Sequence, residues 1–140
     1  MSRVAVVFWS GTGNTAAMAE AVAEGARAAG ADVTILGPTE FTAEKAEGFD
    51  GIAFGCPAMG AEVLEEYEFE PMFTDVEGLL AGKKIALFGS YGWGDGQWMR
   101  DWEDRCFDAG IRLAATSVMA NYAPSEADQE MCRALGRALV

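Results

Sequence analysis

Residues 3–20 read RVAVVFWSGTGNTAAMAE, and this stretch decides the fold because three patterns follow one another in it without a break. Its start, residues 3–9, is apolar and β-branched, which predicts a strand buried on both faces. Residues 14–29 predict a helix, on which Met18 and Val22 lie one turn apart. A loop of glycines and hydroxyl side chains joins the two, so the stretch predicts a strand–loop–helix unit.

The joining loop, residues 10–15, is suited to bind an anion although it contains no lysine or arginine. Glycines let its amides point inward as an anion nest, and the start of the helix adds partial positive charge. Hydroxyls and the Asn14 amide supply further donors. The pattern is neither GxxxxGK[ST] nor GxGxxG, so a single terminal phosphate fits better than a nucleoside triphosphate. The alternative is a simple turn between strand and helix.

Strand and helix patterns continue to alternate along the chain. Strands are predicted over residues 31–37, 49–56, 83–90 and 111–119, and helices over residues 96–109 and 125–140. Trp98, Trp102 and Cys106 fall on one face of the first of these helices, and Ser125 is positioned to cap the second. The order predicts an α/β fold, a doubly wound five-stranded parallel sheet covered on both faces, in one domain spanning residues 1–140.

The composition excludes several classes of function. The formal charge is −12, from 22 acidic and 10 basic residues, so nucleic acid is a poor partner. Histidine is absent, which removes imidazole metal sites and histidine-activated nucleophiles. The three cysteines are widely spaced and predict buried thiols. No apolar run approaches the ~20 residues that cross a bilayer, so we expect a cytoplasmic protein that does not bind membranes.

The loops after the first, third and fourth predicted strands should meet, because the carboxyl ends of parallel strands share one edge of the sheet. They read SGTGNT, PAMGAE and SYGWGDG. Trp93 lies among glycines, where an aromatic side chain can stack on a flat ring. Met59 is adaptable enough to contact the opposite face, and Glu62 can accept a hydrogen bond from a ring N–H. A flat heterocycle that ends in one phosphate points to flavin mononucleotide (FMN).

In order and in spacing, four segments resemble those of short-chain flavodoxins from anaerobic bacteria. They read WSGTGNT, AMGAEVLEE, EFEP and GKKIALFGSYGWGDGQWMRDWE. The resemblance implies a flavodoxin-like sheet of strand order 2-1-3-4-5 that binds FMN without a covalent bond. The fifth strand pattern is uninterrupted, which matches the short chains because long-chain flavodoxins carry an insertion there.

The resemblance also implies a set of cofactor-binding residues, with no catalytic and no metal-binding residues. Ser10, Gly11, Thr12, Gly13, Asn14 and Thr15 would bind the phosphate. Pro57 and Ala58 would also contact the cofactor, and Met59, Gly60, Ala61 and Glu62 would line the inner face and pyrimidine edge of the ring. Ser90, Tyr91, Gly92, Trp93 and Gly94 would form the outer loop. In this family the peptide after the turn glycine, here Gly60–Ala61, turns over on reduction and its carbonyl accepts a hydrogen bond from the flavin. Two positions depart from the family: Pro57 lacks the hydroxyl common there, and Ala61 replaces a polar residue.

The function that the resemblance implies is low-potential one-electron transfer in place of a ferredoxin, with FMN shuttling between semiquinone and hydroquinone. The flavin performs the redox chemistry, and no side chain needs to act as acid, base or nucleophile. Carboxylates at Glu62, Glu65 and Glu66 would disfavour further negative charge on the flavin. We expect a monomer whose redox partners, a reductase donor and an oxidoreductase acceptor, dock through basic surfaces.

Other functions remain open on the same architecture. An FMN-dependent quinone or azo reductase needs a substrate cavity, and this chain has few insertions to build one. A phosphoacceptor receiver domain needs an acidic cluster after the first strand and an aspartate at the end of the third, where Ser10 and Cys56 stand instead. The acidic surface also has a simpler interpretation, which is solubility.

Overall fold

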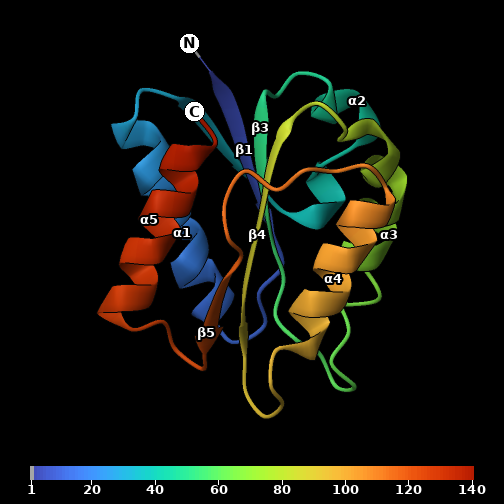
Figure 1. Ribbon diagram of the computed structural model, residues 1–140, viewed down its shortest axis with the longest axis vertical. Coiled ribbons are helices and arrows are strands. Elements are labelled where there is room, and N and C mark those ends of the chain that lie inside the picture. Colours follow the sequence, from blue (N-terminus) through green and yellow to red (C-terminus); the bar gives the residue numbers. More distant parts are fainter. Residues whose placement is uncertain (1) are drawn as a thin grey trace.

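The computed structural model describes residues 2–140, and Figure 1 shows a central sheet between two layers of helices. The strands are β1 (Arg3–Phe8), β2 (Asp32–Leu36), β3 (Gly51–Gly55), β4 (Lys84–Tyr91) and β5 (Val118–Asn121). The α-helices are α1 (Asn14–Ala28), α2 (Ala43–Ala46), α3 (Phe69–Val76), α4 (Gln97–Asp108) and α5 (Glu126–Ala138). Short 3-10 helices, η1 (Pro38–Glu40) and η2 (Glu77–Leu79), precede α2 and follow α3.

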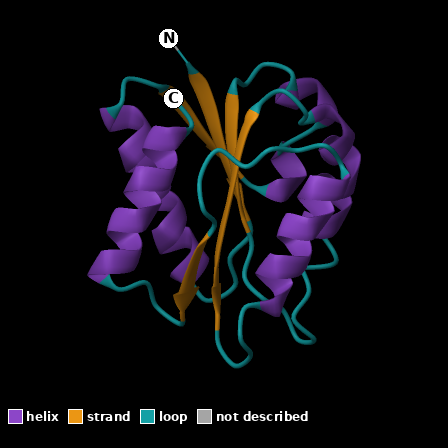
Figure 2. Ribbon diagram, in the orientation of Figure 1, coloured by secondary structure: helices purple, strands orange, loops and turns teal. Residues whose placement is uncertain are grey.

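The sheet has the order β2-β1-β3-β4-β5, and every neighbouring pair of strands is parallel. α1 and α5 cover one face, while α2, α3 and α4 cover the other (Figures 1 and 2). Parallel neighbours need crossover connections, and the helices between successive strands supply them. The doubly wound sheet and its strand order are therefore confirmed.

The two faces of the sheet bury different kinds of side chain. The core between the sheet and the helices α1 and α5 consists mainly of valines and alanines, with Met18 of α1 among the few larger residues. The other face is rich in aromatic rings. Phe54 meets Phe73 edge to face at 5.1 Å between ring centroids, and Phe69 meets Trp102 in the same way at 5.4 Å. Such contacts stabilise the core beyond the burial of apolar area.

Glycines bring α1 and α5 into close contact. A Cβ at Gly25 would overlap the carbonyl group of Arg133, and a Cβ at Gly136 would overlap the carbonyl group of Val22. Each glycine therefore leaves room for the backbone of the other helix. Protein interiors of this density have little freedom to shift when an atom is added.

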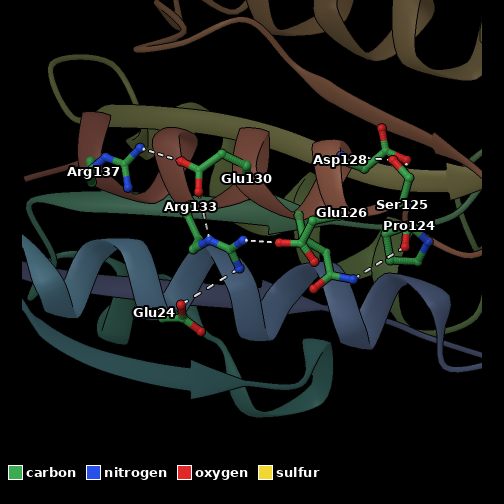
Figure 3. Close-up of polar contacts among 9 residues, drawn as sticks. Glu24, Pro124, Ser125, Glu126, Asp128, Glu130, Arg133 and Arg137 are labelled. Atoms are coloured by element: carbon green, nitrogen blue, oxygen red, sulfur yellow. Dashed lines mark hydrogen bonds and ion pairs between the residues drawn. The ribbon is translucent and has the colours of Figure 1, made fainter.

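Polar contacts hold the start and the outer edge of α5 (Figure 3). The Ser125 hydroxyl accepts a hydrogen bond from the Asp128 N–H at 3.1 Å, and the Asp128 carboxylate accepts one from the Ser125 N–H at 2.9 Å. This capping box confirms the predicted cap. Arg133 pairs with Glu130 at 3.1 Å and reaches Glu24 of α1 at 3.8 Å. Because the glutamates are exposed, these ion pairs add little to the stability of the fold. The contact between the two helices therefore depends mainly on packing.

The prediction of a fifth strand over residues 111–119 is wrong, because β5 spans only Val118–Asn121. Leu113 forms an isolated bridge to β4, and regular pairing begins only at Val118. Between them the chain leaves the sheet, and the Ser117 hydroxyl donates a hydrogen bond to the Glu103 carboxylate of α4 at 2.7 Å. The apolar and β-branched residues between positions 111 and 119 favour a strand, but tertiary contacts override that propensity here.

α3, which contains Pro71, is a helix that the sequence analysis does not predict. The proline lies in the first turn, where a missing N–H breaks no intrahelical bond. Glu65 caps this end: its carboxylate accepts hydrogen bonds from the N–H groups of Tyr67, Glu68 and Phe69 at 2.9, 2.7 and 2.8 Å. Burial opposes ionisation of Glu65, but these three hydrogen bonds outweigh it and lower its pKa.

The three cysteines, Cys56, Cys106 and Cys132, are fully buried free thiols, which confirms the predicted burial. Burial raises the pKa of each thiol to about 12. Across the described chain no group of acidic or cysteine side chains is arranged to hold a metal ion. None of the helices within residues 2–140 has both the length and the apolar character to cross a membrane.

Candidate cofactor site

The loops after β1, β3 and β4 meet at the carboxyl edge of the sheet, the lower edge in Figure 1, where open α/β sheets bind ligands. They border a cavity of about 270 Å³. Its lining consists of Trp9, Gly11, Thr12, Asn14, Thr15, Pro57, Ala58, Met59, Ser90, Tyr91, Gly92 and Tyr122. Other predicted site residues lie on the same loops without lining this cavity: Ser10, Gly13, Gly60, Ala61, Glu62, Trp93 and Gly94.

The hydroxyl of Ser10 fixes the first loop. Its Oγ accepts hydrogen bonds from the N–H groups of Gly13 at 3.1 Å and Ala16 at 3.3 Å. Gly13 has φ = 96°, in the left-handed region that glycine adopts freely. Asn14 and Thr15 begin α1 and line the cavity, and N–H groups in a first helical turn have no intrahelical acceptor. The loop therefore presents free N–H donors and a helix N-terminus to an anion.

Thr15 and Ser90 join the first loop to the third. Both side chains are buried, and their hydroxyl oxygens lie 3.2 Å apart, in hydrogen-bond contact. The Ser90 N–H also donates to the Thr15 hydroxyl at 3.4 Å. The Thr15 hydroxyl, predicted as a direct phosphate donor, thus already bonds within the protein and holds two parts of the cavity wall together.

The second loop ends in a tight hairpin turn. Met59 and Val63 exchange two backbone hydrogen bonds of 2.9 and 3.2 Å, which leaves Gly60, Ala61 and Glu62 at the tip. Gly60 has φ = 24° and Glu62 has φ = 55°. A left-handed conformation at a residue with a side chain costs about 1 kcal/mol or more, so the tip stores strain at Glu62. A Cβ on Gly60 would meet no atom within 4 Å, so backbone conformation and not packing requires glycine there.

The side chain of Glu62 lies against the third loop. A Cβ on Gly94 would overlap its carboxylate, so the glycine leaves space for it. The Glu62 Oε1 atom is buried and has no hydrogen-bond partner within residues 2–140. Leaving a buried acceptor unpaired costs about 1–3 kcal/mol, more if it is charged, so this atom fits a donor from a ligand or from solvent.

The third loop places one aromatic side chain inside and one outside. Tyr91 lines the cavity and packs on Trp98, with 5.5 Å between ring centroids. The Trp98 indole N–H donates to the carbonyl of Cys56 at 3.1 Å, which ties the loop region to the end of β3. Trp93 is 72% exposed, so its ring offers an uncovered apolar surface beside the cavity.

Two aromatic residues of the cavity, Trp9 and Tyr122, are missing from the predicted set. Trp9 packs against the core and also lines the cavity, and its position directly before the first loop was a usable signal. Tyr122 has φ = 60°, and its N–H donates to the carbonyl of Tyr91 at 2.7 Å. Asn121 donates to the carbonyl of Gly92 at 2.9 Å. Tyr122 directly follows β5 at the carboxyl edge of the sheet. Because the fifth strand was predicted to end at residue 119, the sequence analysis did not place Tyr122 at this edge.

The cavity is lined by neutral residues, with no acidic, basic or histidine side chain among them. Cys56, next to Pro57, has its pKa raised to about 12 by burial and is therefore a protonated thiol, which is a poor nucleophile. The Glu65 carboxylate is committed to the N-terminus of α3. The arrangement can hold an anion and a flat apolar group, and the cavity lining offers no carboxylate, amine, imidazole or thiolate for nucleophilic or acid–base chemistry.

These features fit FMN. The free N–H groups and hydroxyls of the first loop suit a phosphate, while Met59, Tyr91 and the uncovered Trp93 suit a flat ring. The unpartnered Glu62 Oε1 suits a ring N–H, the donor that a flavin carries and that the second loop does not supply. The residues present therefore match both ends of this cofactor.

Comparison with known proteins agrees with this fit. A family model described as Flavodoxin matches residues 6–136. A flavodoxin from Clostridium beijerinckii is 46% identical over 125 residues, which cover 89% of this chain and 91% of the relative. A flavodoxin from Megasphaera elsdenii is 45% identical over 135 residues, which cover 96% of each protein.

The same family is found among solved structures. The solution structure of two-electron reduced Megasphaera elsdenii flavodoxin matches the present fold with a TM-score of 0.89. The two chains are 44% identical, and the match covers 97% of each. Family model, sequence and structure thus agree over nearly the whole chain, which belongs to the flavodoxin family of FMN-binding electron carriers.

Proposed function

We propose that this flavodoxin is a low-potential carrier that takes the place of a ferredoxin and passes one electron at a time. The observation that carries the proposal is the cavity lining, which has donors for an anion and apolar surfaces for a ring but no carboxylate, amine, imidazole or thiolate. When bound, FMN supplies the redox chemistry, and the protein positions and tunes it. The quinone or azo reductase alternative is not favoured, because the two relatives that match over nearly the whole of both chains are flavodoxins.

We assign the phosphate to the first loop and the ring to the second and third. The proposed ligand residues are those of the predicted set: Ser10, Gly11, Thr12, Gly13, Asn14, Thr15, Pro57, Ala58, Met59, Gly60, Ala61, Glu62, Ser90, Tyr91, Gly92, Trp93 and Gly94. Ser10 acts partly by holding the loop, since its Oγ already accepts two backbone hydrogen bonds. Trp9 and Tyr122 join the set because both line the cavity.

Negative charge beside the ring supports a low potential. The Glu62 carboxylate lies against Gly94 of the outer loop, and its Oε1 atom is buried, where charge is weakly screened. Glu65 contributes less, because three N–H groups surround its charge. Glu66 is exposed, and solvent screens it. We therefore attribute the tuning mainly to Glu62.

An equilibrium redox titration followed by absorbance tests the proposed function. Two separated one-electron steps are expected, the second at the lower potential, and Glu62→Gln should raise the second potential because it removes one negative charge. A single two-electron step, together with steady-state NADH oxidation by the protein alone, would support the reductase and overturn the carrier.

We further propose that residues 1–140 form one FMN-binding domain that acts as a cytoplasmic monomer with basic redox partners. A net charge of −12 can steer such partners toward the protein. Electron-transfer rates to a cationic acceptor, measured by stopped flow, should fall as salt rises, because the Debye length is only ~8 Å at 0.15 M. Rates that stay constant with salt would favour the solubility interpretation of the acidic surface. Sedimentation at several concentrations tests the monomer.

A further inference from the structure

Two buried side-chain polar atoms within residues 2–140 lack a hydrogen-bond partner, Glu62 Oε1 and Trp102 Nε1. Both side chains line the same cavity, which lies between the second loop and α4 and has a volume of about 150 Å³. Leu64, Trp98 and Arg105 also border it. None of these residues lines the 270 Å³ cavity assigned to the cofactor.

The two atoms have complementary chemistry. An indole N–H can only donate a hydrogen bond, and an ionised carboxylate oxygen can only accept one. A group that satisfies both must accept from Trp102 and donate to Glu62, which water does. The cavity has room for several molecules, because one water occupies ~30 Å³. We propose that an ordered water bridges Trp102 to Glu62 and that Trp102 is, through this water, a positioning residue for the cofactor site.

Packing keeps the Trp102 indole in place. The residue is 2% exposed, and its ring meets Phe69 at 5.4 Å and Phe73 at 5.7 Å, both edge to face. Trp98 provides a contrast on the same helix: it is 1% exposed, yet its N–H donates directly to the Cys56 carbonyl. The two indoles are about equally buried, but the N–H of Trp98 has a protein acceptor, whereas the N–H of Trp102 needs an acceptor from solvent.

The bridge has a consequence for Glu62. This residue lies on the strained tip of the second loop, with φ = 55°, and the protein provides its Oε1 with no donor. A water held by Trp102 ties the carboxylate to α4 and leaves its remaining lone pairs for the ring N–H. The inference rests on the proposed function to the extent that Glu62 contacts the cofactor.

The first test uses the unmodified, FMN-loaded protein. In ¹⁵N-resolved NMR spectra that detect transfer from long-lived water, the Trp102 indole N–H should show a much stronger water contact than the Trp98 indole N–H, which donates to the Cys56 carbonyl. Trp98 is the internal control because it is as deeply buried. A Trp102 signal as dry as that of Trp98, or a crystal structure with a direct Trp102–Glu62 hydrogen bond, would overturn the bridge.

The second test is a double-mutant cycle on the FMN dissociation constant. Trp102→Phe keeps an aromatic ring but removes the N–H, and should weaken FMN about two- to tenfold, the range for one hydrogen bond. In a Glu62→Leu background the same change should have almost no effect. An equal factor in both backgrounds means that Trp102 acts through packing alone, and the positioning role is then wrong.

The two tests separate the two proposals. If the purified protein takes up no FMN, the proposed function fails, whereas the water contact of Trp102 can be measured with or without the cofactor. If Trp102→Phe does not fold, the NMR comparison of the two indoles in the unmodified protein still decides whether the bridge exists.

Discussion

The two helical layers support the cofactor site in different ways. In the α1/α5 layer, Gly25 and Gly136 let the helix backbones touch, and α1 starts at the loop assigned to the phosphate. In the α3/α4 layer, aromatic rings such as Phe69 and Trp102 fill the core, and a cavity of about 150 Å³ remains beside the second loop. The phosphate end therefore rests on a close-packed layer, and the ring end on a layer with room for solvent.

Backbone conformation follows the same division. Around the phosphate loop, a glycine takes the left-handed conformation, Gly13 with φ = 96°. At the ring end Gly94 does so with φ = 99°, and so does one residue with a side chain, Glu62 with φ = 55°, two positions after Gly60 with φ = 24°. We infer a fixed anchor for the phosphate and an adjustable contact for the ring. The following four variants test this distinction.

The largest effect is expected for Gly25→Ala. The added Cβ overlaps the Arg133 carbonyl, and backbone cannot move aside as a flexible side chain can, so we expect a loss of about 3 kcal/mol in the free energy of unfolding, the upper end for overpacking. Urea unfolding measures it. Gly78→Ala is the control, because a Cβ there meets nothing within 4 Å. Equal stability of the two variants would contradict a close-packed α1/α5 layer.

The next effect concerns the phosphate end. Thr15→Ala removes a hydroxyl that lines the cavity and leaves the buried Ser90 without this partner, so FMN should bind more weakly by about 2 kcal/mol, within the range for an unpaired buried polar group. Fluorescence titration measures this loss, and riboflavin, which has no phosphate, should bind weakly to both proteins. Thr39→Ala, at an exposed threonine of η1, is the control. The anchor role is refuted if riboflavin and FMN bind with equal affinity.

A smaller effect is expected at the adjustable end. Gly60 has φ = 24°, at the edge of the left-handed region, and the turned-over form implied by the family is a type II′ turn that needs φ of about 60°. Gly60→Thr should therefore be strained more in the reduced protein than in the present conformation, and a difference of roughly 1–2 kcal/mol would lower the first one-electron potential by roughly 40–80 mV.

The second one-electron potential of Gly60→Thr should move less, because the turn is already turned over in both states of that step. Potentiometric titration gives both potentials, and Gly78→Thr is the matched control at an exposed glycine without positive φ. An unchanged first potential combined with weaker FMN binding would mean that Gly60 only leaves space for the ring.

The smallest effect is expected for Glu65→Gln, about 1 kcal/mol in the free energy of unfolding at pH 7, since the amide oxygen keeps part of the cap. The pKa of Glu65 is lower in the folded than in the unfolded protein. Its stabilisation is thus present above the ordinary carboxyl pKa of about 4.3 and is lost as the pH falls through the folded-state pKa.

Urea unfolding of Glu65→Gln at pH 7 and at pH 3 checks this sign. The difference in free energy of unfolding between the variant and the unmodified protein should be smaller at pH 3 than at pH 7. Glu66→Gln, at an exposed neighbour, should change the free energy of unfolding little at either pH. A difference that does not depend on pH would show that the charge of Glu65 contributes nothing to the cap.

The anchor was easier to predict from sequence than the adjustable end. Strand, loop and helix of the anchor lie within residues 3–28, so local patterns and the requirement for glycine define them. Tyr122 and the placement of the Glu62 carboxylate depend on contacts between segments far apart in the sequence, with Tyr91 and Gly94 respectively. The start of β5 was missed for the same reason, because propensity cannot show where a chain leaves and rejoins a sheet.

The burial of all three sulfurs has a practical consequence. Thiolates are the species that react with maleimides and disulfides, and Cys56, Cys106 and Cys132 are each buried with a pKa raised to about 12. A cysteine introduced at exposed Glu66 would therefore be the one reactive thiol on an otherwise native background. Photo-crosslinkers attached at such positions, one at a time, could map where donor and acceptor proteins dock without first removing any natural cysteine.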